Sequence, residues 1–173
     1  MRASIPEFPI GSVSGRFWRM LRIRYFRDPL SGEGARLYGG RWNRPGCPAL
    51  YMARTHATAI AEFHQDVVVP GTLVAYDVES ARIADLAGDG YRERPEIEDA
   101  ITAQWLRIAR LEGRDPSSWT IADRLIDVGC DGALVPSAQS VGGINLVLWR
   151  WSADGSAGAT VTAIDPYGEL SPR

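Results

Sequence analysis

The chain has 173 residues, 45% of them hydrophobic and 23% charged, a composition typical of one globular domain with a sizeable core. It has no apolar run of the roughly 20 residues that a membrane helix needs and no secretion signal, so we expect a cytoplasmic protein without a membrane partner. Its two cysteines and two histidines lack the spacing of a disulfide framework or a metal site, so we expect no metal.

Charge is unevenly distributed along the chain. All 19 basic residues are arginine, and residues 1–54 carry a net charge of +7 against −9 for the remainder. A basic N-terminal third indicates an anionic ligand or an acidic partner surface there. The overall charge of −2 disfavours a protein that binds nucleic acid through its phosphate backbone, so a small anion is the expected ligand.

In chain order, we expect an N-terminal arm over residues 1–15 and the domain itself over 16–173. Basic and apolar residues alternate over 16–24, which predicts a short half-buried strand or a turn. The segment 26–40 is rich in Gly, Pro, Ser and Asp and predicts a loop. The apolar run 48–53 predicts a buried strand.

A helix is expected over 57–67, with Thr55 as its N-cap. Its apolar stripe consists of Ala59, Ile60, Phe63 and Val67. Glu62 lies at the border of this stripe and therefore does not face open water. Because a carboxylate beside a core needs a partner, Glu62 is either a functional residue or half of a buried ion pair with an arginine.

The second half of the chain predicts a mixture of strands and helices. Strands are expected over 72–78, 133–136, 144–151 and 160–165, and helices over 95–112 and from Asp115 to Gly129. The strict strand–helix alternation of a doubly wound parallel sheet is missing. The expected fold class is therefore α+β, a single domain with a mixed β core and flanking helices.

A glycine pair, Gly39 and Gly40, precedes Arg41, and Tyr51 follows ten residues later. The glycines let the backbone approach a ligand, and a guanidinium can bind phosphate or carboxylate through two parallel donors. This favours an anion-binding role for Arg41, with an exposed arginine packed over Trp42 as the alternative. Tyr51 on its own is more typical of a core residue.

Two polar residues near the end of the chain are further candidates. Ser137 follows an expected strand, where serine is most often a turn former. Asn145 is more informative, because asparagine is depleted in strands and its amide must be satisfied. The phosphate loop, the dinucleotide fingerprint and the serine-hydrolase elbow are all absent from the sequence. The six tryptophans are expected to pack, with stacking on single-stranded nucleic acid as the less favoured alternative.

Together these residues resemble the RES domain family of bacterial toxins. The resemblance rests on GGRWN at 39–43, LY at 50–51, ATAIAE at 57–62, VPS at 135–137 and NLVL at 145–148. It extends from about Phe17 to Asp165 and implies a fold similar to ADP-ribosyltransferases, in which a split β core holds NAD in a cleft. It also implies a partner, a cognate antitoxin that covers this cleft.

The resemblance assigns roles to the candidates. Arg41, Glu62 and Ser137 take the places of the three residues that name the family, and Arg19 and Tyr51 match further site residues. The two arginines would hold phosphate, Tyr51 would stack on nicotinamide, and Glu62 would bind ribose hydroxyls and stabilise positive charge on the sugar.

The remaining candidates would complete this site. Ser137 and Asn145 would fix the amide or the ribose, and Gly40 would let the backbone approach the ligand. Ser140 competes with Ser137 for the serine role, since it lies only three residues further along.

The implied activity is cleavage of the nicotinamide–ribose bond, which depletes NAD by hydrolysis or phosphorolysis, so NAD is a substrate. One alternative is a mono-ADP-ribosyltransferase that modifies a cellular protein. Another is an interaction module that binds NAD without chemistry.

Overall fold

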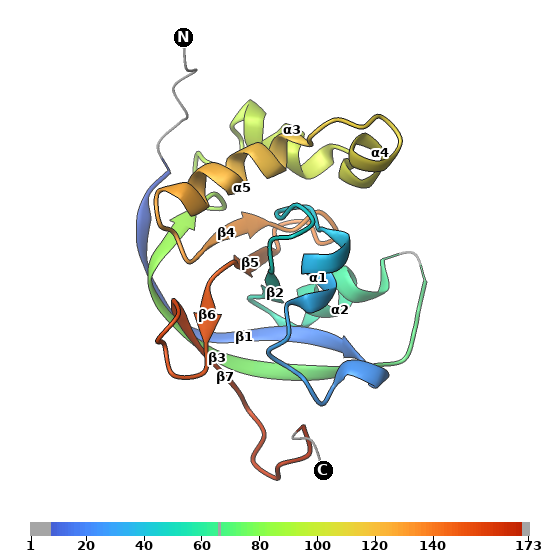
Figure 1. Cartoon of the computed structure of the whole chain (residues 1–173), viewed down its shortest axis with the longest axis vertical. Coiled ribbons are helices and arrows are strands. Elements are labelled where there is room, and N and C mark those ends of the chain that lie inside the picture. Colours follow the sequence, from blue (N-terminus) through green and yellow to red (C-terminus); the bar gives the residue numbers. More distant parts are fainter. Residues whose placement is uncertain (1–7, 66, 171–173) are drawn as a thin grey trace.

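Two long paired strands form the base of the fold (Figure 1). In this computed structural model, which describes residues 8–65 and 67–170, β1 (Ile10–Arg22) runs antiparallel to β3 (Gly71–Asp85) over nearly its full length. Strand β7 (Ala159–Ala163) pairs with the middle of β3, and the short β6 (Trp151–Ser152) pairs with β7.

Three shorter strands form the other half of the sheet. The central one, β5 (Ile144–Leu148), is antiparallel to both β2 (Leu50–Ala53) and β4 (Gly132–Pro136). This half joins the long ribbon at two places. The end of β3 pairs in parallel with β4, and β1 meets β2 at Trp18 and Ala53. The β core is therefore a mixed sheet, as the sequence pattern predicted, and it is split into two halves, as the family resemblance implied.

Both faces of β4 and β5 are buried, which explains their continuous apolar sequences. Leu134 and Leu146 pack against the long ribbon, whereas Ala133 and Val147 point to the helices. This alternation follows from the two-residue period of a strand. The sheet half that carries β5 is thereby held between two apolar clusters.

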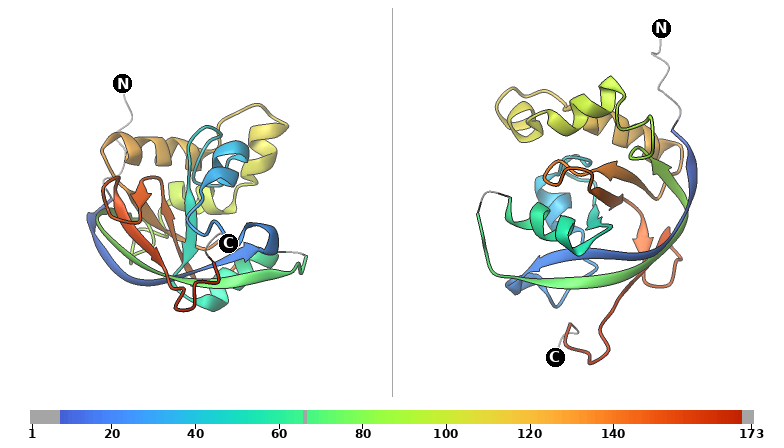
Figure 2. Two further views of the ribbon diagram at one scale, coloured as in Figure 1. Left: turned by 60° about the horizontal axis from the view of Figure 1, so that its bottom comes forward. Right: turned by 180° about the vertical axis from the view of Figure 1, so that it is seen from behind.

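The helices fall into two groups (Figures 1 and 2). Helices α3 (Pro95–Thr102), α4 (Trp105–Arg110) and α5 (Ser117–Asp127) lie above β4 and β5. The other two, α1 (Glu33–Tyr38) and α2 (His56–His64), flank β2. A short 3₁₀ helix, η1 (Ile23–Tyr25), follows β1.

Several expected elements differ from the structure. The segment 26–40 contains α1 and is not loop throughout, the helix expected over 95–112 is broken into α3 and α4, and the strand expected over 144–151 ends at Leu148. Helix α2 ends at His64, where Gln65 adopts a positive φ of 44°. The expected arm contributes Ile10–Gly15 to β1, and its residues 1–7 lie outside the described part of the chain.

The described helices are all too short or too polar to cross a membrane.

Candidate active site

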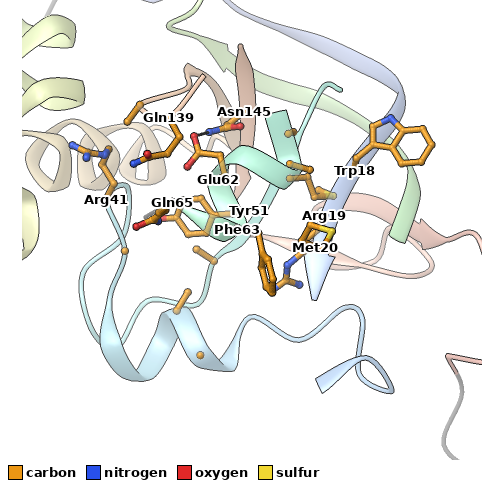
Figure 3. Close-up of a pocket in the computed structure, with 18 of the residues that line it drawn as sticks. Trp18, Arg19, Met20, Arg41, Tyr51, Glu62, Phe63, Gln65, Gln139 and Asn145 are labelled. Carbon is orange, nitrogen blue, oxygen red and sulfur yellow. Dashed lines mark hydrogen bonds between the residues drawn. The ribbon is translucent and has the colours of Figure 1, made fainter. Parts of the chain in front are cut away.

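A cavity of about 460 Å³ opens where β1, β2, β5 and α2 meet (Figure 3). Six of the seven candidates from the sequence line it: Arg19, Gly40, Arg41, Tyr51, Glu62 and Asn145. The seventh, Ser137, does not line the cavity itself but donates a hydrogen bond to Glu62, which does. The volume is within the range of small-molecule sites.

Glu62 projects into the cavity from α2. The helix starts where Thr55 accepts a hydrogen bond from the Thr58 amide, as its sequence predicted. One oxygen, Oε1, accepts two hydrogen bonds, from Ser137 Oγ at 2.5 Å and from Asn145 Nδ2 at 2.7 Å. Among the described residues no donor reaches Oε2. The carboxylate is thus fixed by one oxygen and offers the other to a ligand.

Ser137 begins the loop that joins β4 to β5. Its hydroxyl donates to Glu62 and accepts from the backbone amides of Gln139 and Ser140 at 3.2 and 3.0 Å. Ser140 points elsewhere, with its hydroxyl oxygen 3.5 Å from the Thr58 hydroxyl. Of the two serines that compete for the site, the structure therefore brings Ser137 to the carboxylate.

Asn145 occupies the start of the central strand β5. A carboxylate can only accept, so the amide nitrogen must face Glu62. The amide oxygen, Oδ1, is buried without a hydrogen-bond partner among the described residues. Asn145 therefore donates to Glu62 while its own amide oxygen is left without a donor, a rare arrangement for a buried polar group.

Arg41 lies at one side of the cavity and contacts the helical layer. Its Nη1 donates to the carbonyls of Ala100 and Ala103 at 2.9 and 2.8 Å, at the break between α3 and α4. Burial lowers the pKa of Arg41 and the charge of Glu62 opposes this shift, so the guanidinium stays charged. Its Nε and Nη2 bind no described residue and are the donors left for an anion.

The hydroxyl of Tyr51 packs against Gly40 and hydrogen-bonds to the residues that follow Arg41. Its hydroxyl accepts from the Trp42 amide at 3.0 Å and donates to Asn43 Oδ1 at 2.7 Å, and burial raises its pKa. A Cβ at Gly40 would lie 2.6 Å from this hydroxyl, so no larger residue fits. Gly39 has a φ of 73°, which glycine tolerates. The ring of Tyr51 still lines the cavity.

Arg19 projects from β1 on the side opposite Arg41, with Glu62 and Tyr51 between them in the view of Figure 3. Its Nη1 donates to the carbonyls of Pro29 and Ser31, both at 3.3 Å, and burial lowers its pKa. A ligand that contacts both arginines would have to span the cavity.

The sequence as a whole matches a known family. A model of the RES domain matches residues 16–171, which is nearly the whole chain. The chain belongs to the RES domain family.

The similar proteins differ in how much of this chain they match. The NAD(+) phosphorylase MbcT of Mycobacterium tuberculosis is 31% identical over 141 residues, which cover 72% of this chain and 71% of MbcT. This chain also matches, at 44% identity over shorter segments, Toxin Res of Photorhabdus laumondii and the Prs ADP-ribosylating toxin of Sphingobium sp. (strain YBL2). They cover 26% and 27% of this chain, and 29% and 30% of those proteins.

A solved structure supports the fold. The crystal structure of the M. tuberculosis MbcT–MbcA toxin–antitoxin complex matches with a TM-score of 0.56 and 24% identity, over 93% of this chain and 91% of that chain. Because its identity is low, this match carries the fold alone.

In this RES domain several cavity residues were not predicted from sequence. Phe63 follows Glu62 directly and its ring fills the space beside Gly71, where a Cβ would lie 2.7 Å from it. Trp105, expected to pack like the other tryptophans, lines the cavity. Gln139 lies in an exposed loop whose sequence carries no signal for a site.

A second cavity of about 350 Å³ is lined by Ser137 and not by Glu62. It is bounded by the segment that precedes α3, by α3 itself and by Gly142 and Gly143. Over residues 8–65 and 67–170, no three His, Cys, Asp or Glu side chains gather in a way that could hold a metal ion.

Proposed function

We propose that this RES domain is the toxin of a toxin–antitoxin pair and that it consumes NAD by cleaving the nicotinamide–ribose bond. The observation that carries the proposal is the position of Glu62, held by Ser137 and Asn145 at the wall of an arginine-lined cavity. The name of MbcT, an NAD(+) phosphorylase, supports the choice of substrate. The domain would span residues 16–173, preceded by the arm over 1–15, and would act on NAD in the cytoplasm.

Cleavage requires stabilisation of a cationic sugar. When the bond between the ribose C1′ and the nicotinamide nitrogen breaks, its electron pair leaves with nicotinamide and the ribosyl group becomes oxocarbenium-like. We propose that Oε2 of Glu62 faces this group, binds a ribose hydroxyl and lowers the energy of the cation. An oxygen of water or of inorganic phosphate then supplies the electron pair for the new bond to C1′, and water releases a proton to the solvent as it does so.

The other residues would bind and orient NAD. Arg41 would hold the diphosphate through Nε and Nη2, and Arg19 would provide an anion contact from the opposite side. Tyr51 would present its ring to nicotinamide, while Gly40 lets the backbone come close to the ligand.

The first test is made in cells. Expression of the wild-type chain should deplete NAD and stop growth, and Glu62→Gln should abolish both effects because it keeps the size of the side chain but removes its charge. Glu79→Gln, the same change at an exposed position on β3, serves as the matched control and should remain toxic. Unchanged NAD depletion by Glu62→Gln would refute the assignment.

A second candidate is transfer of ADP-ribose to a cellular protein. The match to the Prs ADP-ribosylating toxin favours it, although over a short segment. Incubation with labelled NAD and cell lysate separates the two activities, since label fixed to one protein indicates transfer and free ADP-ribose or its phosphate indicates degradation. An NAD-binding module without chemistry would release no nicotinamide.

We also propose an antitoxin partner that covers the cavity. The complex of MbcT with MbcA supports this, as does the +7 charge of residues 1–54, which suits an acidic segment placed where the NAD phosphates would bind.

A further inference from the structure

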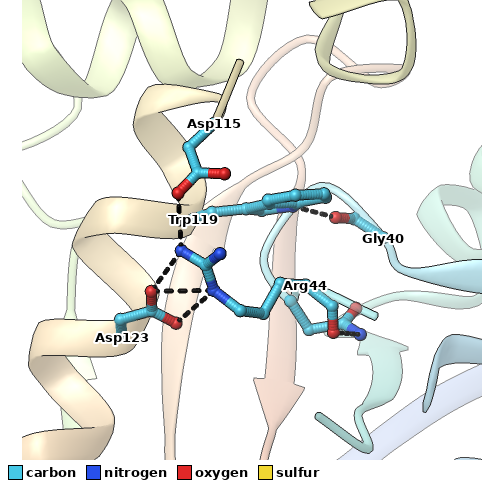
Figure 4. A network of polar contacts seen from close by, with 6 residues as sticks. Gly40, Arg44, Asp115, Trp119 and Asp123 are labelled. Atoms are coloured by element: carbon cyan, nitrogen blue, oxygen red, sulfur yellow. Dashed lines mark hydrogen bonds and ion pairs between the residues drawn. The ribbon is translucent and has the colours of Figure 1, made fainter. Parts of the chain in front are cut away.

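A network of polar contacts joins the segment that carries Arg41 to helix α5 (Figure 4). Arg44 donates through Nε to Asp123 Oδ2 at 2.9 Å, and through Nη2 to the same oxygen at 2.6 Å and to Asp115 at 3.0 Å. The hydrogen bonds to the two carboxylates raise the pKa of Arg44. These contacts fix the segment on the C-terminal side of Arg41.

Trp119 lies at the centre of this network. The Arg44 guanidinium lies over its ring, 5.4 Å from the ring centroid, and the Trp119 Nε1 donates to the Gly40 carbonyl at 2.8 Å. That carbonyl belongs to the peptide bond that leads into Arg41. The Asn43 amide donates to the same carbonyl at a longer distance, 3.4 Å. The indole N–H is therefore the shorter of two hydrogen bonds that orient the peptide immediately before Arg41.

The residue after Arg41 is fixed as well. Trp42 donates its amide to Tyr51 and accepts from Trp149 Nε1 at its carbonyl, at 2.9 Å. With the backbone held on both sides, the Arg41 side chain is directed to the carbonyls of Ala100 and Ala103. Only Nε and Nη2 then remain for a ligand.

We propose that Trp119 is a positioning residue of the NAD site, which acts through Arg41 and is supported by Arg44 and Asp123. The proposal rests on the proposed function, because it assumes that Arg41 holds the NAD diphosphate. Exposed ion pairs contribute little to stability, and the Arg44 and Asp123 side chains are 36% and 38% exposed. A small displacement of a residue that binds substrate has a larger effect on activity.

The test is a double-mutant cycle read out by the affinity for ADP-ribose, which carries the diphosphate but is not cleaved. Trp119→Phe keeps an aromatic side chain but removes the N–H together with part of the indole ring, and should weaken binding about tenfold. Arg41→Ala should weaken it more. In the Arg41→Ala background, Trp119→Phe should cost less than about twofold, because the residue through which it acts is gone.

Trp151→Phe is the matched control. The Trp151 Nε1 also donates to a backbone carbonyl, that of Leu30 at 3.0 Å, but this carbonyl is not beside Arg41. Trp151→Phe should therefore change the ADP-ribose affinity by the same factor in the wild-type and in the Arg41→Ala background. If Trp119→Phe also has the same factor in both backgrounds, its role is purely structural and the proposal is overturned.

Asp123→Asn gives a second reading if Trp119→Phe does not fold. It should weaken ADP-ribose binding about threefold and lose this effect in the Arg41→Ala background. Binding as tight as wild type in both folded variants would also overturn the proposal. If the wild-type chain fails to bind ADP-ribose at all, the NAD site itself is wrong, which is a distinct result.

Discussion

The hydrogen bond from Ser137 to Glu62 predicts how the two competing serines differ. Ser137→Ala removes a donor 2.5 Å from a carboxylate oxygen, and a hydrogen bond to a charged group contributes about 1.5–3 kcal/mol. If Glu62 stabilises the transition state, this loss lowers kcat/KM by about 10- to 150-fold. Ser140→Ala removes only a contact at 3.5 Å and should change kcat/KM by less than about threefold.

The assay is the initial rate of nicotinamide release from NAD by the two purified variants and wild type, with thermal unfolding measured in parallel. Asn145 still donates to Glu62 in Ser137→Ala, so the variant should keep some activity. A larger loss in Ser140→Ala than in Ser137→Ala would refute the reasoning. Complete inactivity of a folded Ser137→Ala would instead indicate that the serine reacts with the substrate directly.

Two further predictions concern the neighbours of Glu62 and Arg41. Tyr51→Phe leaves the Asn43 side-chain oxygen and the Trp42 amide without a partner, so the free energy of unfolding should fall by about 2 kcal/mol. Calorimetry should show a Tm lower by about 4–8 °C, and an unchanged Tm would contradict the burial of this hydroxyl. Asn145→Asp places a second carboxyl group beside Glu62, and one of the two then retains a proton to higher pH. A proton held on Glu62 removes the negative charge that the sugar cation needs, so NAD cleavage by this variant should rise with pH more than that of wild type. A pH profile like that of wild type would contradict the contact.

Local sequence patterns were enough to predict several of the residues at the cavity. The helical period placed Glu62 at the edge of an apolar stripe, and the glycine pair marked Arg41 as a residue near a ligand. Both lie at the cavity in the structure.

Long-range contacts could not be predicted in this way. Helix propensity over 95–112 indicates one helix, since no Gly or Pro lies near its middle. In the structure the helix is nevertheless interrupted at Ala103, between α3 and α4. At this break the Ala103 and Ala100 carbonyls accept hydrogen bonds from Arg41, a residue about 60 positions away. The six-residue helix α1 was missed for a related reason, because so short a helix depends on packing and not on propensity.

The two hydrogen bonds that Glu62 Oε1 accepts are also long-range contacts. Ser137 and Asn145 are brought together by the pairing of β4 with β5, which a sequence can suggest. The approach of α2 to this pair depends on how β2 docks against β5, and no local pattern encodes it. The network of Trp119 and Arg44 likewise joins residues 79 positions apart in the sequence.

The central claim is that Glu62 enables cleavage of the nicotinamide–ribose bond, and nicotinamide release by the purified chain tests it most directly. The reaction is run with wild type, Glu62→Gln and the exposed control Glu79→Gln, each with and without inorganic phosphate. Wild type and Glu79→Gln should release nicotinamide, and Glu62→Gln should be slower by about 10³-fold while unfolding at a similar temperature. Equal rates for the two glutamine variants, or no release by wild type under either condition, would contradict the account.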